Sequence, residues 1–246
     1  MILPDTRLLS QFLSAGGGPR LLRNRLTTNP PENWHFSAYG DETREEVNRN
    51  FQRLQSKKWP PPTSPADPFP FRAKATSKGA LLNDKYSLLI EDFAGEKSEN
   101  LIDSEKKSKL QGTDFLQDVI RSDAVMLAID IERILDYSTE ENKNYQMEMV
   151  NTVNAMLEKK GIEPGQKMQS PLALLFLKSD LLDEKQKYMI TGYFNKLIPY
   201  CDKRCKSFKY FMVSSVGKVE NGKPPREINP DNIFEPLLWI LKQLNA

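Results

Sequence analysis

Residues 86–96 read Tyr-Ser-Leu-Leu-Ile-Glu-Asp-Phe-Ala-Gly-Glu, a short apolar run that stops at an acid and a glycine. A nearly continuous apolar run of this length, bounded by turn residues, is typical of a strand that is buried on both faces of a parallel sheet. In open α/β sheets, ligands bind beyond the carboxyl ends of the strands. We therefore expect Asp92 and Gly95 to lie at a crevice and not in the core.

The composition limits the classes of function. The 246 residues suffice for one sizeable α/β domain. The 35 basic and 33 acidic side chains nearly cancel to a net charge of +2, which argues against binding to nucleic acid or to anionic membranes. No apolar run approaches the roughly 20 residues that span a bilayer, so the sequence predicts a soluble, cytoplasmic protein without a membrane span.

Cysteine and histidine are scarce. Cys201 and Cys205 are four residues apart in a predicted helix, and we interpret them as reduced thiols because a structural zinc site needs about four ligands. Any Ser-His-Asp or Cys-His catalysis would depend on His35, the only histidine. The composition therefore gives little support to either kind of site.

Apolar periodicity divides the chain into alternating strands and helices. Strands are predicted at residues 34–39, 69–76, 86–93, 124–131, 171–177 and 208–213. Helices are predicted at 8–13, 42–58, 113–121, 145–161 and 188–198, with a polar loop at 136–144. The pair Asn232 and Glu235 has the spacing of a capping box and predicts the start of a last helix. Strands 69–76 and 86–93 are expected to form an antiparallel hairpin.

This alternation predicts an α/β fold with a doubly wound, mostly parallel sheet, helices on both faces and one antiparallel hairpin at the edge. We interpret residues 1–246 as a single domain with a variable part at 1–58 and a core at 71–246. Between them, residues 59–70 contain six prolines. Proline neither continues a helix nor joins a central strand, so this segment is predicted to be an exposed, extended loop.

Polar residues also follow two later predicted strands. Lys178, Ser179 and Asp180 follow the most apolar run of the chain, and Ser214 and Ser215 follow the next strand. Guanine has two N–H donors on one edge, so a fixed carboxylate such as Asp180 can accept both, whereas adenine lacks that pair. Alternatively, Lys178 and Asp180 cap the helix that follows.

The order of these motifs resembles that of Ras-like GTPases in the P-loop NTPase superfamily, over about residues 59–246. The motifs are Asp92-x-x-Gly95, the strand that contains Ser122-Asp-Ala-Val-Met, Lys178-x-Asp180 and Ser214-Ser215. The pieces Trp59-Pro-Pro-Pro-Thr63 and Asp92-Phe-Ala-Gly-Glu96 are most similar to the bacterial double-GTPase group.

The resemblance implies GTP or GDP with Mg²⁺ as ligands. Asp92 and Thr63 would hold Mg²⁺, and the backbone N–H of Gly95 would contact the terminal phosphate. Lys178 would lay its aliphatic stem along the base, and the N–H of Ser215, next to Ser214, would donate to the guanine carbonyl oxygen.

The resemblance also bears on hydrolysis and switching. Glu96 stands where small GTPases have the glutamine that orients the attacking water, and a carboxylate there repels phosphate, so hydrolysis is doubtful. The loops at 59–70 and 96–109 would be the switch segments and would bind a protein partner.

The family's phosphate-binding motif, Gly-x-x-x-x-Gly-Lys-Ser/Thr, is missing from this sequence. The nearest candidate, Gly16-Gly-Gly-Pro-Arg20, lacks the lysine and the hydroxyl and follows a predicted helix. Leu177 also stands where the family has Asn or Thr. We therefore expect the central first strand and the phosphate loop to be absent.

Three hypotheses remain open. In the first, the chain is a guanine-nucleotide switch whose phosphate loop lies upstream of Met1, which predicts an open sheet centre. In the second, it is a pseudo-GTPase, a scaffold that binds partners without hydrolysis, which predicts an apolar replacement for the missing strand. In the third, residues 60–70 are a polyproline ligand for an adaptor domain.

Overall fold

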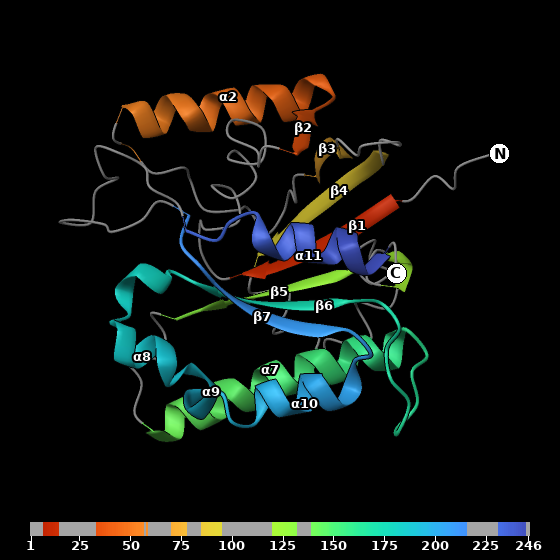
Figure 1. Cartoon of the computed structure of the whole chain (residues 1–246), viewed down its shortest axis with the longest axis vertical. Helices are drawn as coiled ribbons and strands as arrows, with labels where there is room; N and C mark the ends of the chain where they lie inside the picture. Colours follow the sequence, from red (N-terminus) through yellow and green to blue (C-terminus); the bar gives the residue numbers. More distant parts are fainter. Residues whose placement is uncertain are drawn as a thin grey trace.

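Seven strands form one mixed sheet in the order β2-β3-β4-β1-β5-β6-β7 (Figure 1). The structure is a computed structural model of the whole chain, and the residues it describes are 7–14, 33–56, 58, 70–77, 85–94, 120–131, 139–215 and 231–244. The strands are β1 (Arg7–Ser14), β2 (Trp34–Ala38), β3 (Pro70–Ser77), β4 (Lys85–Ala94), β5 (Val125–Asp130), β6 (Leu172–Leu177) and β7 (Phe208–Val213). The helices are α2 (Asp41–Gln55), α7 (Thr139–Lys159), η1 (Ser179–Leu181), α8 (Glu184–Tyr188), α9 (Ile190–Tyr193), α10 (Leu197–Arg204) and α11 (Glu235–Leu244).

The centre of the sheet is occupied by β1, which was predicted to be a helix. It runs parallel to β4 along its whole length, from Arg7 opposite Ser87 to Ser14 opposite Ala94. On its other side, Phe12 and Leu13 pair in parallel with β5. The apolar residues in this segment have helical spacing, but a run this short fits a buried strand equally well. The predicted helix at 8–13 is wrong, and the central first strand is present.

The antiparallel part of the sheet is larger than predicted. The hairpin of β3 and β4 is confirmed, with Phe71 opposite Ile90. However, β3 is not at the edge, because β2 pairs antiparallel with its outer side. The ring of Phe36 in β2 is 2% exposed and lies in the core beside the small side chains of Ala73 and Ala75. Such aromatic contact with small neighbours favours burial of this edge strand.

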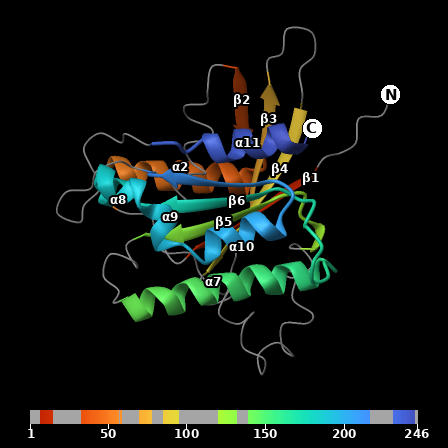
Figure 2. The same cartoon turned by 60° about the horizontal axis from the view of Figure 1, so that its bottom comes forward.

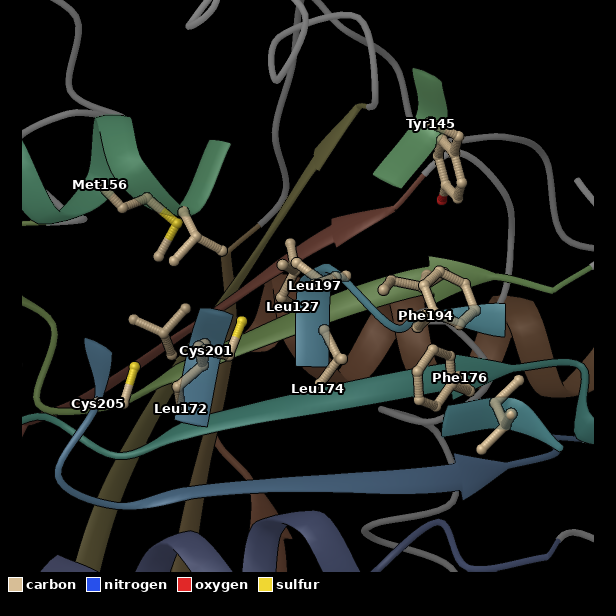
Figure 3. Close-up of a cluster of buried hydrophobic side chains, with 14 of the residues drawn as sticks. Leu127, Tyr145, Met156, Leu172, Leu174, Phe176, Phe194, Leu197, Cys201 and Cys205 are labelled. Atoms are coloured by element: carbon tan, nitrogen blue, oxygen red, sulfur yellow. The ribbon is translucent and has the colours of Figure 1, made fainter. Parts of the chain in front are cut away.

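One face of the sheet is covered by α7, α9 and α10 (Figures 1 and 2). Figure 3 shows the core on this face, where Leu127 and Phe176 from the strands meet Phe194 and Leu197. The rings of Phe176 and Phe194 have centroids 4.7 Å apart. Each fully buried side chain of this size contributes roughly 1.5–3 kcal/mol to folding. This core fixes the position of β6, whose end carries the candidate site.

The opposite face is covered by α11, with α2 alongside the β2–β3 edge (Figure 2). Leu237, Ile240 and Leu241 are buried in the same cluster as Leu175 of β6. The Thr43 hydroxyl in α2 accepts a hydrogen bond from the Arg72 N–H at 3.4 Å, which links α2 to β3. Helices therefore cover both faces of the sheet, as the sequence predicted.

Three predicted helix boundaries were wrong. Residues 139–144 belong to α7, because Glu140 and Glu141 stabilise the positive end of the helix dipole in its first turn. The helix predicted at 188–198 is divided among α8, α9 and α10. The last helix begins at Glu235, and Asn232 has a left-handed φ of 53° where the capping box was predicted.

The break between α9 and α10 is held by Gln146 from α7. Its Nε2 donates to the Tyr193 carbonyl at 2.6 Å, and its Oε1 accepts from the Lys196 N–H at 3.2 Å. Gln146 is 3% exposed, so these bonds satisfy its own buried side-chain amide. Within the described part of the chain, none of the helices has the length and apolarity that crossing a bilayer requires.

Candidate functional site

The carboxyl ends of β4, β1, β5, β6 and β7 lie along one edge of the sheet, since these strands are parallel. The strand order reverses beside β1, which has β4 on one side and β5 on the other (Figure 1). Ligands of open α/β sheets bind at such a switch point, outside the carboxyl ends of the strands. The carboxyl ends of these five strands therefore mark the edge at which the candidate site lies.

The chain makes a tight, strained turn where β6 ends. Lys178 has φ 60° and ψ 37°, a left-handed conformation that is rare for a residue with a side chain. The single turn η1 follows, with the Leu181 N–H donating to the Lys178 carbonyl at 3.0 Å. This conformation costs about 1–2 kcal/mol, and such strain is concentrated at functional sites. The turn brings Asp180 to the edge of the sheet.

Asp180 is held by Ser214 at the end of the neighbouring strand. The Ser214 hydroxyl donates a hydrogen bond to Asp180 Oδ1 at 2.6 Å. Ser214 is 2% exposed, so water competes little for its hydroxyl. A carboxylate has about four acceptor positions, so this bond orients Asp180 and still allows it to accept from a ligand. The structure thus brings together two residues that the sequence placed in the base site.

Ser214 is itself held by backbone pairing with Asp231. The Ser214 N–H donates to the Asp231 carbonyl at 3.0 Å, and the Asp231 N–H donates to the Ser214 carbonyl at 2.8 Å. The sequence reasoning missed Asp231, because no local pattern indicates an isolated bridge to a segment that is distant in sequence. The pairing joins the end of β7 to the start of the chain that enters α11.

The helix after η1 is capped by Asp183 and not by Lys178 or Asp180. Asp183 Oδ1 accepts from the Gln186 N–H at 2.7 Å, and Gln186 Oε1 accepts from the Asp183 N–H at 2.9 Å. This is a complete capping box. Lys178 is the N-cap residue of the single turn η1, without a side-chain capping bond, but neither Lys178 nor Asp180 caps α8.

The charge of Lys187 is influenced by Asp180 and Asp231. Lys187 in α8 is hydrogen-bonded to Glu184 at 2.8 Å. That bond, together with the negative charges of Glu184, Asp231 and Asp180, raises the pKa of Lys187 above its usual range.

The predicted metal side of the site is only partly described. Asp92 lies opposite Phe12 of β1, two residues before β4 ends. Three strand spacings separate β4 from β6, a distance of about 14 Å. Thr63, Gly95 and Glu96, the other predicted metal, phosphate and catalytic residues, lie outside the described residues, as does the Gly16–Arg20 segment. Ser215, the remaining base-site residue, directly follows Ser214.

Asp130 is an acidic residue at this edge that the sequence reasoning missed. It ends β5 and lies opposite Leu177 of β6 in the parallel register. The signal was present, because Asp130 closes an apolar run just as Asp92 does. Among the described residues, no group of three or more His, Cys, Asp and Glu side chains could hold a metal ion.

The Ser122 motif lies at the opposite end of the sheet. Ser122 precedes the amino end of β5, and its carbonyl accepts a hydrogen bond from Lys160 Nζ at 2.9 Å. Burial lowers the pKa of Lys160 and raises the pKa of the neighbouring Asp123, while their mutual attraction opposes both shifts. This group anchors α7 to the start of β5 and is distant from the candidate site.

Comparisons with known proteins find distant similarity to solved structures. A scan against protein-family models finds no match, and a search of the curated proteins finds none either. Among solved structures, 27 chains match. One is Methanosarcina barkeri Roco2 RocCORdC bound to GDP, with 14% identity and a TM-score of 0.35. The match covers 87% of this chain and 45% of that one, so this chain spans less than half the length of its neighbour.

Proposed function

We propose that this chain is a GTPase-like protein that binds guanine nucleotides at the carboxyl edge of its sheet and hydrolyses GTP slowly or not at all. The observation that carries the proposal is the hydrogen bond from Ser214 to Asp180, which joins the ends of β6 and β7. It holds a carboxylate in one orientation at the carboxyl edge of the sheet, two strands from β1. A fixed carboxylate accepts both N–H donors of guanine and discriminates against adenine.

The remaining ligand contacts follow from the order of the strands. The base would lie at β6 and β7, between the Lys178 stem and the Ser215 N–H, with Asp180 accepting from its edge. The phosphates would extend toward β1 and β4. There the Gly95 N–H would meet the terminal phosphate, and Asp92 and Thr63 would hold Mg²⁺.

The position of β1 changes the hypothesis about the phosphate loop. A loop upstream of Met1 required an open sheet centre, but β1 fills the place between β4 and β5. In our proposal the phosphates therefore meet the segment that follows Ser14, the Gly16–Arg20 run. This run offers the backbone N–H groups of its glycines but no lysine, and Pro19 has no backbone N–H to donate. We expect weak binding of the phosphates as a consequence.

A second candidate function, a pseudo-GTPase scaffold, is supported by the lack of a lysine in the Gly16–Arg20 run. A phosphate segment without lysine leaves the charge that develops during hydrolysis poorly stabilised. Glu96, in place of a water-orienting glutamine, adds a further negative charge. In this version the protein binds guanine nucleotide without hydrolysing it, and binds a protein partner through residues 59–70 and 96–109.

We also propose that residues 1–246 form one domain of the double-GTPase type.

The proposal is tested by titrating fluorescent GDP, GTP and ATP into the purified protein, with and without Mg²⁺. We expect a preference for guanine nucleotides that Asp180→Ala reduces about a hundredfold, because it removes two hydrogen bonds to a charged acceptor. Asp202→Ala, an exposed aspartate on α10, is the matched control and should bind as the wild type does. Equal binding of GTP and ATP would refute the proposal.

Hydrolysis is measured separately by phosphate release. We expect a rate near background for the wild type and an increase for Glu96→Gln, which restores a neutral residue able to orient water. A wild-type rate typical of an efficient GTPase would contradict the scaffold version but not the guanine site.

A further inference from the structure

We propose that the corner formed by Asp231 and Asn232 positions Asp180 for guanine, acting through Ser214 and without touching the nucleotide. This inference rests on the proposed function and extends it to residues that lie outside the motifs of the family. It makes the entry into α11 part of the base site.

The first step is the pairing of Ser214 with Asp231. One residue, Asp231, engages both backbone polar groups of Ser214, at 3.0 and 2.8 Å. Rotating the Ser214 backbone would break both bonds, and each contributes about 0.5–1.5 kcal/mol to stability. The direction of the Ser214 hydroxyl toward Asp180 is set by this backbone. A shift of Asp231 would therefore change the orientation of the Asp180 carboxylate.

The second step is the conformation of Asn232. Its φ of 53° lies in the left-handed region, which asparagine tolerates better than most residues with a side chain. Here the chain changes direction between the bridge at Asp231 and the buried residue that follows. A β-branched residue cannot adopt this φ without strain, so it would displace one side of the corner.

The third step is the anchoring of the far side of the corner. Ile233 is 4% exposed and belongs to the core beneath α11. The Phe234 ring stacks against Phe36 of β2 with centroids 6.1 Å apart, and its carbonyl accepts from the Leu238 N–H at 2.9 Å. Because this side is held by packing, strain at Asn232 is relieved on the Asp231 side. The bridge to Ser214 is the part that would yield.

The arrangement of charges agrees with this assignment. The carboxylates of Asp231 and Asp180 both act on the ammonium group of Lys187, together with its own helix neighbour Glu184. Lys187 forms its ion pair with Glu184, at 2.8 Å. The effect of the corner on Asp180 is tested through the backbone, with these charges left unchanged.

The test compares Asn232→Val with Asn232→Gly in the full-length protein. Glycine keeps the left-handed conformation, whereas valine opposes it. We expect Asn232→Val to weaken GDP binding at least about tenfold, and Asn232→Gly to stay within about threefold of the wild type. Amide hydrogen exchange at Ser214 and Asp231 should accelerate in Asn232→Val only. Asn232→Ala, with a milder strain, replaces the valine variant if that variant does not fold.

Gly161→Val is the matched control, because Gly161 also has a left-handed φ, of 72°, but lies at the end of α7. It should lower the melting temperature and leave GDP affinity unchanged. Wild-type affinity in Asn232→Val despite faster exchange at Ser214 would overturn the positioning role and leave the guanine site standing. Equal losses in the valine and glycine variants would also overturn it. Absence of guanine binding in the wild type would overturn the proposed function and this inference with it.

Discussion

Ser214 donates a 2.6 Å hydrogen bond to Asp180, and this contact joins the ends of two adjacent parallel strands. Hydrogen bonds to ionised groups are shorter and about twice as strong as neutral ones. Burial of Ser214 shields the bond from water. The orientation of the Asp180 carboxylate is therefore set by the protein before a ligand binds, which reduces the conformational entropy that the Asp180 side chain loses on binding.

Removing this hydroxyl should weaken nucleotide binding. In Ser214→Ala, Asp180 loses its fixed orientation, and we expect GDP affinity to fall roughly 10- to 150-fold, because hydrogen bonds to charged groups contribute about 1.5–3 kcal/mol. Calorimetric titration measures the change. Ser207→Ala, at the opposite end of β7, is the control and should bind normally. Unchanged affinity in Ser214→Ala would show that orientation of Asp180 by Ser214 is irrelevant to binding.

Lys178 should show a trade between stability and binding. Its left-handed backbone, with φ 60°, is strained. Lys178→Gly relieves the strain. Its free energy of unfolding, measured in urea, should equal that of the wild type or exceed it by up to about 1 kcal/mol. It should also bind GDP more weakly, since the aliphatic stem is lost. Lys178→Ala loses the stem but keeps the strain, so it should gain no stability. Normal GDP binding by both variants would remove Lys178 from the base site.

The sequence predicted correctly the strands whose apolar runs fit a strand and not a helix. β5 and β6 are uninterrupted apolar runs bounded by turn residues, so their burial on both faces was evident. β1 contains Ser10 and Gln11 between two apolar pairs, a pattern that a helix and a strand share. Pairing with β4 and β5 resolved the ambiguity, and such pairing cannot be seen in a local window.

The sequence predicted only those parts of the site that follow from the order of the strands. The motif order put Asp180 and Ser214 at neighbouring strand ends, but the pairing of Ser214 with Asp231 depends on tertiary structure. Asp183 and Asn232 both have capping-box spacing, and the box forms at Asp183. At Asn232 the packing of the residues that follow imposed a left-handed turn instead. Local patterns therefore offer options among which packing selects.

The central position of β1 can be tested with proline. Proline has no backbone N–H and is not accommodated inside a central strand, so Gln11→Pro should destabilise the protein by about 3 kcal/mol or more. Gln11→Thr, which favours strands and disfavours helices, should be tolerated within about 0.5 kcal/mol. Chemical denaturation followed by circular dichroism gives both values. Greater damage from threonine than expected would favour a helix in this segment.

The two cysteines should be unreactive in the folded protein. Burial raises the pKa of the Cys205 thiol to about 12, and burial beside Cys205 also raises the pKa of Cys201. At pH 8 the thiolate fraction of Cys205, and with it the rate of alkylation by iodoacetamide, should be roughly a thousandfold below that of an ordinary thiol. Stability from burying neutral thiols is fully present below about pH 8.5 and is lost as pH rises toward 12. Mass spectrometry in native buffer and in guanidinium measures the difference, and rapid native alkylation would place these thiols at the surface.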